Sequence, residues 1–199
     1  SAIEENDSKD RSRFYQKIFD AYQSFMFMAS AFLIVFVRIL SNILINSNIY
    51  PEYATAFRYT PVLIIGVLMM CFNQFLSSVY TATQNTTHSF WTSLVAAIVN
   101  IVLNIILIHL WGIMGAAIAT FFSYFVCYCI RIVDARRYIP FQVNHAKFLA
   151  NSGILFLLGI VVVDAPPMWI PLLIVGLAFM VFYNFSAILQ TLTQLKRRR

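Results

Sequence analysis

The sequence predicts an all-α integral membrane protein with six transmembrane helices. Of its 199 residues, 60% are hydrophobic and only 11% are charged, whereas soluble domains have about 45–50% apolar and about 25% charged residues. A soluble fold of this length has too little interior to bury so much apolar surface. The apolar residues form continuous runs of roughly the 20 residues that a helix needs to cross a bilayer, without the alternation typical of transmembrane β-strands.

The six predicted spans follow one another with short gaps. They are placed at 25–45, 59–80, 90–110, 113–133, 148–163 and 168–190. Each gap holds residues that end helices or favour turns, namely Asn46-Ser47-Asn48 with Tyr50-Pro51-Glu52, Thr83-Gln84-Asn85-Thr86-Thr87, Trp111-Gly112, Arg136-Arg137 with Pro140, and Asp164-Ala165-Pro166-Pro167. The fifth span is short for a membrane crossing, so we expect it to begin within 144–147.

The distribution of Lys and Arg predicts which loops are cytoplasmic. With the N-terminus inside, only Arg58 falls in an outer loop, and Arg38 lies within a span. The other twelve basic residues then lie on the cytoplasmic side: Lys9, Arg11, Arg13, Lys17, Arg131, Arg136, Arg137, Lys147, Lys196, Arg197, Arg198 and Arg199. This bias follows the positive-inside rule and predicts that both termini are cytoplasmic. The loop 81–88 is the exception, because it is cytoplasmic in this topology yet has no basic residue.

Three regions are expected along the chain. Residues 1–24 form a cytoplasmic segment in which Phe14, Ile18 and Ala21 share a helical face, which suits either a short helix on the inner leaflet or the start of a long helix. Residues 25–190 form the transmembrane lobe, and residues 191–199 form a basic cytoplasmic tail suited to lipid electrostatics. Because the sequence opens with Ser1, we expect a fragment of a longer protein.

Arg38 is a permanent cation inside the first apolar run, FLIVFVRILSNIL. It lies about 10 Å from the outer end of that span by helix rise, and a centred arginine costs about 2.5–3.5 kcal/mol on insertion scales. Three interpretations stay open. The side chain can snorkel to the outer headgroups, it can bind an anionic substrate in a polar cavity through its forked donors, or it can pair with Glu52.

The second predicted span carries a polar face. Asn73, Ser77 and Tyr80 recur at three- and four-residue spacing, and Gln74 lies beside them. Buried amides require hydrogen-bond partners. These side chains therefore either line a wet path or bond to neighbouring helices.

Two further groups are expected to serve helix packing. Asn100 and Asn104 are four residues apart and share a face of the third predicted span. Gly112 and Gly115 open the fourth span, where small residues permit close approach of helices.

No metal site, cofactor or catalytic centre is expected. The three histidines, His88, His109 and His145, lie at the ends of different spans and on different sides of the membrane. The cysteines lie inside apolar runs and lack zinc-binding spacing. We therefore expect a protein that is not an enzyme.

Three stretches in this order carry a family resemblance: SAIEENDSKDRSRFYQKIFDAY, VYTATQNTTHSFWTSLVAAIVNIVLNIILI and HLWGIMGAAIATFFSYFVCYCIRI. They contain an N-x-x-x-N pattern at Asn100 and Asn104 and a G-x-x-G-A-A pattern that begins at Gly112. The order resembles the C-terminal half of bacterial polysaccharide exporters, the O-antigen flippases of the multidrug/oligosaccharidyl-lipid/polysaccharide exporter superfamily. The likeness covers most of residues 1–138. The family's G-x-T-K-like turn is replaced by 84–87, which lacks the glycine and the lysine.

The resemblance implies a fold of 12 to 14 helices in two lobes around a central cavity, so six spans would form about one lobe. Besides its substrate, the chain would contact membrane lipids and an N-terminal lobe of the same longer chain, and it would bind no nucleic acid. The substrate would be an undecaprenyl-pyrophosphate-linked oligosaccharide, flipped across the bacterial cytoplasmic membrane by alternating access for O-antigen or lipopolysaccharide synthesis. Candidate cavity residues are Arg38, Arg58, Asn73, Gln74, Ser77 and Tyr80.

Three alternatives stay open, and one of them is a non-transporting scaffold subunit. A multidrug extruder of the same superfamily would favour intramembrane carboxylates, and the six predicted spans contain none. A membrane-embedded glycan polymerase or glycosyltransferase would need a sizeable outer loop or an acidic metal-binding motif, and the predicted outer loops are short.

Overall fold

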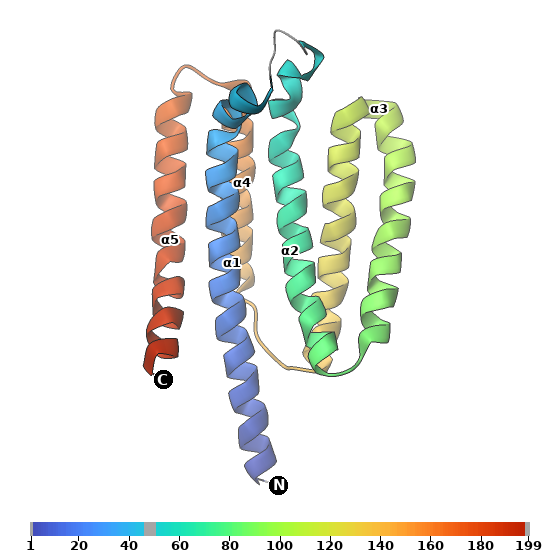
Figure 1. Cartoon of the computed structure of the whole chain (residues 1–199), viewed down its shortest axis with the longest axis vertical. Helices are drawn as coiled ribbons and strands as arrows, with labels where there is room; N and C mark the ends of the chain where they lie inside the picture. Colours follow the sequence, from blue (N-terminus) through green and yellow to red (C-terminus); the bar gives the residue numbers. More distant parts are fainter. Residues whose placement is uncertain (1, 46–50, 198–199) are drawn as a thin grey trace.

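The computed structural model describes the backbone of residues 2–45 and 51–197 and the side chains of residues 10–45, 55–189 and 193. This part of the chain is almost entirely helical and contains no strand, which confirms the all-α class. The elements in chain order (Figure 1) are α1 (Ala2–Leu44), the 3-10 helix η1 (Pro51–Arg58), α2 (Thr60–Ala82), α3 (Thr86–Asp134), the 3-10 helix η2 (Ala135–Arg137), α4 (His145–Asp164) and α5 (Trp169–Arg197).

The structure differs from the prediction of six spans at α3. Five helices in the described chain are long and apolar enough to cross a membrane, and α3 contains both the third and the fourth predicted spans. At Gly112, where φ is 56° and ψ is −132°, α3 folds back on itself, so that its two arms run side by side (Figure 1). The third and fourth predicted spans are therefore the two arms of one hairpin, and the described chain has five long apolar helices where the prediction had six.

The turn of this hairpin depends on two glycines. Gly112 adopts a positive φ that costs glycine little and other residues more. At Gly115 an added Cβ would overlap the carbonyl oxygen of Leu107 on the opposite arm. We call residues 86–111 the first arm and residues 113–134 the second arm.

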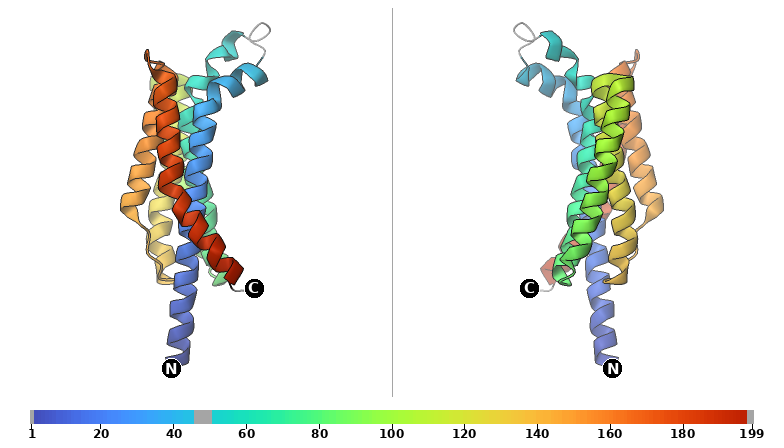
Figure 2. Two further views of the ribbon diagram at one scale, coloured as in Figure 1. Left: turned by 90° about the vertical axis from the view of Figure 1, so that its left-hand side faces the viewer. Right: turned by 90° about the vertical axis from the view of Figure 1, so that its right-hand side faces the viewer.

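The helices are arranged around α1 and α2. α1 contacts α2, α4 and α5, whereas α3 packs chiefly on α2. Both termini lie at the same end of the molecule (Figure 1). The N-terminal part of α1 extends beyond the bundle, and the last part of α5 bends away from it (Figure 2). Residues 10–24 therefore belong to one long helix, while the domain boundaries and the cytoplasmic side stay predictions.

Aromatic rings fill the centre of the bundle around Phe72 of α2. Its ring centroid lies 6.1 Å from that of Phe19, 5.5 Å from Phe27, 5.9 Å from Tyr128 and 5.9 Å from Phe148. In a bilayer, lipid tails are as apolar as these side chains, so burial alone gives little driving force and the fit of the rings matters more. Aromatic pairs contribute about 0.5–1.5 kcal/mol beyond area burial. Phe72 thus joins α1, α3 and α4 to α2.

The ends of α4 follow from its flanking residues. Asn144 caps its start, because its Oδ1 accepts a hydrogen bond of 3.0 Å from the backbone N–H of Lys147. Ala165, with φ of 44°, and the following Pro166 and Pro167 end the helix. α4 therefore begins within 144–147, as expected for the short fifth span, and has 20 residues.

Candidate functional site

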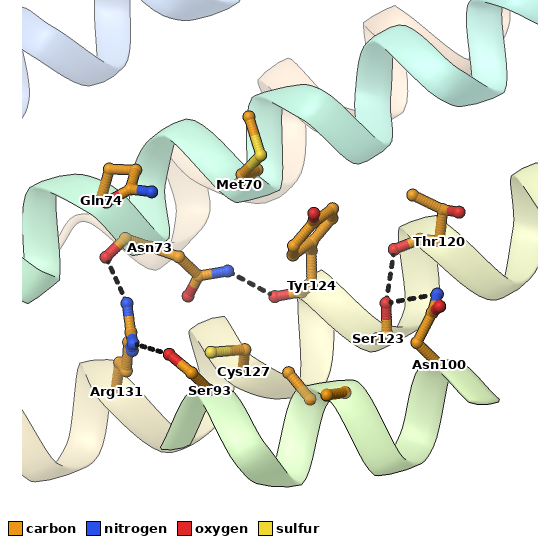
Figure 3. A pocket seen from close by; sticks show the side chains of 12 residues that line it. Met70, Asn73, Gln74, Ser93, Asn100, Thr120, Ser123, Tyr124, Cys127 and Arg131 are labelled. Carbon is orange, nitrogen blue, oxygen red and sulfur yellow. Dashed lines mark hydrogen bonds between the residues drawn. The ribbon is translucent and has the colours of Figure 1, made fainter. Parts of the chain in front are cut away.

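A polar groove lies between α2 and the two arms of α3 (Figure 3). Its volume is about 400 Å³, within the range of about 300–1,000 Å³ for small-ligand sites. Amide, hydroxyl and guanidinium groups alternate along it with small apolar side chains. Its lining residues are Met70, Asn73, Gln74, Ser93, Ala96, Ala97, Asn100, Thr120, Ser123, Tyr124, Cys127 and Arg131. The groove thus gathers several amide, hydroxyl and guanidinium side chains on the surfaces that α2 and α3 turn toward each other.

Arg131 forms one end of this groove and ties three helical segments together. Its Nε donates to Thr92 Oγ1 at 2.9 Å, and its Nη1 donates to the backbone oxygen of Asn73 at 2.7 Å. Its Nη2 donates to Ser93 Oγ at 2.8 Å and to the backbone oxygen of Ser89 at 3.0 Å. The guanidinium is therefore fixed between α2 and both arms of α3.

The charge of Arg131 is buried but not neutralised by a direct contact. The residue is 4% exposed, and its acceptors are hydroxyl and carbonyl oxygens. No carboxylate pairs with it in the part of the chain that the structure describes. Burying a charge is costly unless hydrogen bonds compensate, and here they do so while leaving a net positive charge beside the groove. Such an arrangement favours an anion in the groove.

The far end of the groove is held by amides and hydroxyls. Asn100 Nδ2 donates to Ser123 Oγ at 3.2 Å, and Ser123 Oγ donates to the backbone oxygen of Thr120 at 2.9 Å. Asn104 Nδ2 donates to the Asn100 carbonyl and side-chain oxygens at 2.9 and 3.0 Å. Asn100 and Asn104 thus share a face, as expected, and Asn100 joins the two arms of α3 as well as lining the groove.

Asn73 has an unused acceptor at the groove. Its Nδ2 donates to the backbone oxygen of Tyr124 at 2.9 Å, which joins α2 to the second arm. Its Oδ1 is buried and has no partner among the described residues. In Figure 3 the side chain lies between Arg131 and Tyr124. This oxygen has almost no accessible surface, so a ligand hydroxyl reaches it only if the side chain or its neighbours move.

The structure separates the predicted cavity residues of α2 into two groups. Asn73 and Gln74 line the groove. Ser77 and Tyr80 lie outside it and bond to α3, Ser77 through its hydroxyl to that of Ser89 at 2.8 Å and Tyr80 through its O–H to Asp134 Oδ2 at 3.0 Å. Asn73, Ser77 and Tyr80 thus all bond to α3, which supports bonding between helices, and the wet path stays a prediction.

Arg38 lies away from the groove, at the opposite end of α4 from its N-cap. Its Nε donates to the backbone oxygen of Val162 at 2.7 Å, and its Nη2 donates to that of Val163 at 3.0 Å. Its guanidinium carbon is 4.7 Å from the ring centroid of Phe57 and 5.2 Å from that of Trp169. A cation that binds the last carbonyls of a helix also interacts favourably with the helix dipole. In this geometry Arg38 caps α4 and joins it to α1, η1 and α5.

Arg58, the other predicted cation of the cavity, is exposed and also lies outside the groove. It borders a small cavity of about 180 Å³ with Pro61, Met114 and Asp164. The side chain of Glu52, the alternative partner for Arg38, lies outside the described residues. The substrate-binding roles of Arg38 and Arg58 stay predictions without support from the groove.

Sequence reasoning assigned Arg131 to the cytoplasmic surface and missed its place in the groove. A signal was available, because Thr120, Ser123, Cys127 and Arg131 recur every three or four residues and so share one helix face. Its acceptors on the other helical segments are 38 to 58 residues away in sequence, and no local pattern shows them.

Comparison with known families now adds to this geometry. Residues 4–184 match the family model described as "Lipid II flippase MurJ". The chain belongs to the MurJ lipid II flippase family. It is also 28% identical over 114 residues to an uncharacterized membrane protein of Methanocaldococcus jannaschii. That match covers 57% of this chain and 22% of the relative. No solved structure matches the chain.

Family membership refines the expectations from the sequence. It supports the relationship to membrane flippases and a multi-pass membrane protein. It does not support the narrower assignment to O-antigen or lipopolysaccharide synthesis. The chain spans about a fifth of the length of the curated relative that it matches.

Proposed function

We propose that this chain forms part of a transporter that moves a polyprenyl-diphosphate-linked glycan precursor across a membrane. The observation that carries the proposal is the buried charge of Arg131, which no carboxylate pairs with among the described residues, beside a polar groove. Membership in a flippase family gives the class of transported lipid. In this proposal the protein moves its substrate without changing it chemically, so it is a transporter and not an enzyme.

The groove suits the head of such a lipid. Arg131 supplies a fixed positive charge that attracts a diphosphate, and its protein hydrogen bonds hold the guanidinium in place. Asn73, Gln74, Ser93 and Asn100 supply neutral donors and acceptors that match sugar hydroxyls. Each protein–sugar hydrogen bond offsets part of the desolvation of the head during its passage.

A separate apolar groove suits the lipid tail. It lies between α1 and α5, has a volume of about 1030 Å³ and is lined by Val35, Phe36, Leu177 and Phe182 among others. Phe182 is 85% exposed. A polyprenyl chain can lie along such a surface while the head occupies a polar path.

The finer assignments rest on the same reasoning. We propose that the substrate is linked to undecaprenyl pyrophosphate, with either an oligosaccharide repeat unit or the lipid II head attached. The groove would face an N-terminal lobe of the same longer chain, and rocking of the two lobes would expose it to either side of the cytoplasmic membrane. Both termini of this segment would be cytoplasmic.

The test is a flipping assay with the full-length gene product in liposomes, with lipid II and an undecaprenyl-linked repeat unit as separate substrates. We expect Arg131→Gln to lower the flipping rate at least about tenfold, equivalent to about 1.4 kcal/mol of barrier, and Arg131→Lys to lower it less. Arg58→Gln is the matched control, because it removes an exposed arginine outside the groove. Equal rates for the wild-type protein and Arg131→Gln at equal amounts of folded protein would refute the proposed site. Absence of flipping for both substrates would refute the proposed function.

A further inference from the structure

A second cavity lies on α3, apart from the polar groove. It has a volume of about 440 Å³ and sits between the ends of the two arms that are farther from Gly112. Its lining includes His88, Trp91, Ile130, Val133, Asp134 and Arg137, and it shares no lining residue with the polar groove. We propose that this cavity binds an anionic phospholipid, with the headgroup at Arg137 and His88 and an acyl chain against Trp91, Ile130 and Val133.

The polar end of the cavity has donors available for a phosphate. The side chain of Arg137 is 74% exposed, and its Nη1 lies 3.8 Å from Asp134 Oδ1, beyond hydrogen-bond distance. Its guanidinium makes no hydrogen bond within the part of the chain that the structure describes, so its N–H groups are free for a ligand. The imidazole of His88 is 47% exposed. Its Nδ1 contacts Asp134, and its Nε2 is left for a ligand.

Asp134, the carboxylate among the described residues that line this cavity, already has hydrogen-bond partners. Asp134 Oδ2 lies 3.0 Å from His88 Nδ1 and accepts a hydrogen bond of 3.0 Å from the O–H of Tyr80. Arg137 lies beside it, and Arg131 is buried behind Thr92, whose side chain lies between the two cavities. Two arginines against one carboxylate leave this end positive. A basic pocket between transmembrane helices at a cytoplasmic end is suited to an anionic lipid head.

The rest of the cavity is apolar and exposed. Trp91 is 58% exposed, Ile130 37% and Val133 61%. Tryptophan is enriched at membrane–water interfaces, where its ring lies at headgroup level. The cavity therefore places charged donors beside apolar side chains in the order that a phospholipid presents head and tail. A free phosphate would use only the first half of this arrangement.

Such a lipid would hold the two arms of α3 together. Most residues of α3 are exposed or half-buried, and Arg131, His88 and Asp134 connect its arms near this cavity. The proposal concerns lipid binding and not the transported substrate, so its outcome is independent of the proposed function.

The test uses the full-length gene product in detergent, with native mass spectrometry and thermal unfolding as readouts. We expect phosphatidylglycerol to bind more tightly than phosphatidylcholine and to raise Tm. Arg137→Gln should weaken phosphatidylglycerol binding about fivefold, which corresponds to the roughly 1 kcal/mol that one basic residue contributes near an anionic surface. Arg136→Gln is the matched control, because the neighbouring guanidinium instead contacts His145 Nε2 at 3.1 Å. Trp91→Ala should weaken binding of the lipid but not of glycerol phosphate.

Three results would overturn the proposal. The first is equal binding of phosphatidylglycerol and phosphatidylcholine. The second is equal loss of binding in the Arg137→Gln and Arg136→Gln variants, which would indicate a diffuse basic surface. The third is glycerol phosphate binding as tightly as the phospholipid, which would indicate an oxyanion site without a lipid. Because Arg137 is exposed, its substitution does not threaten folding.

Discussion

The bundle of α1, α4 and α5 and the unit of α2 and α3 both contain buried polar side chains, but these side chains have different partners. In the bundle, Asn151 and Asn184 are fully buried and donate to each other at 3.0 and 2.9 Å. Arg38 in the same bundle bonds to the last carbonyls of α4. In the α2–α3 unit, Arg131 and Asn73 border an open groove. The two arginines therefore have different surroundings, because Arg38 caps a helix end and Arg131 borders a groove.

The largest effect is expected from a substitution that forces apart the two arms of the α3 hairpin beside the groove. Gly115→Ala should abolish accumulation of folded protein, because the added Cβ overlaps the carbonyl of Leu107 and the two arms must separate. Gly153→Ala is the control, since a Cβ there meets nothing within 4 Å and alanine is the better helix former by about 1 kcal/mol. Detergent extraction and gel filtration measure the folded fraction. Normal accumulation of the Gly115 variant would contradict this account of the turn.

The next effect separates the two arginines by transport. Arg131→Met should lower flipping more than tenfold, about 1.4 kcal/mol or more in barrier, because it removes the charge and leaves the acceptors on Asn73 and Ser93 without their donor. Arg131→Lys keeps the charge and should recover part of the rate. Flipping per molecule of folded protein is the measurement. If Arg38→Met lowers that rate more than Arg131→Met does, the assignment of the groove is reversed.

The third effect separates the same arginines by stability. Arg38→Ala should lower the free energy of unfolding by about 1–3 kcal/mol, from the lost helix-end interaction and the lost cation–π contacts with Phe57 and Trp169. Flipping per folded molecule should stay unchanged. Thermal unfolding in detergent measures the first quantity, and Arg58→Ala is the control at the same end of the molecule. A stable Arg38→Ala protein that no longer flips lipid would restore the substrate-binding interpretation.

The smallest effect tests the bundle itself. Asn151→Leu and Asn184→Leu should each destabilise the protein, because the remaining amide loses its partner in an apolar interior. The double substitution should cost less than the sum of the two. Interhelical hydrogen bonds in membranes average about 0.6 kcal/mol in double-mutant cycles and reach about 1.7 kcal/mol, and we expect a coupling in that range. Additive losses would mean that the two amides stabilise the bundle separately.

Much of the fold could be predicted from the sequence, because hydropathy and breakers act locally. Each long apolar helix of the described chain coincides with one predicted apolar run, or in α3 with two, and Asn144 and Pro166 lie where α4 begins and ends. The hairpin was predicted as two helices because Trp111-Gly112 marks a tight turn between two apolar runs. Whether one residue or several interrupt the helix depends on the φ of Gly112, which the sequence permits but does not require.

Only the α2 side of the groove could be predicted from the sequence. Asn73 and Gln74 were identified because their spacing on one helix is a local property. The position of Arg131 depends on α2 and both arms of α3, and the partners of Arg38 lie 124 and 125 residues away. Snorkelling, substrate binding and an ion pair were the interpretations available for Arg38 from its own helix. Capping of a distant helix end was not visible there.

The attachment of the α3 hairpin has a mechanical consequence. Because α3 packs chiefly on α2, its hairpin is attached to the rest of the bundle mainly along one side. A tilt about α2 would widen or narrow the groove while the amide pair between α4 and α5 stayed intact. Arg131 would stay near the axis of such a tilt, because it bonds to α2 and to both arms at once. Tyr128 on the second arm stacks on Phe148 of α4 with ring centroids 5.1 Å apart, so the same tilt would slide one ring across the other.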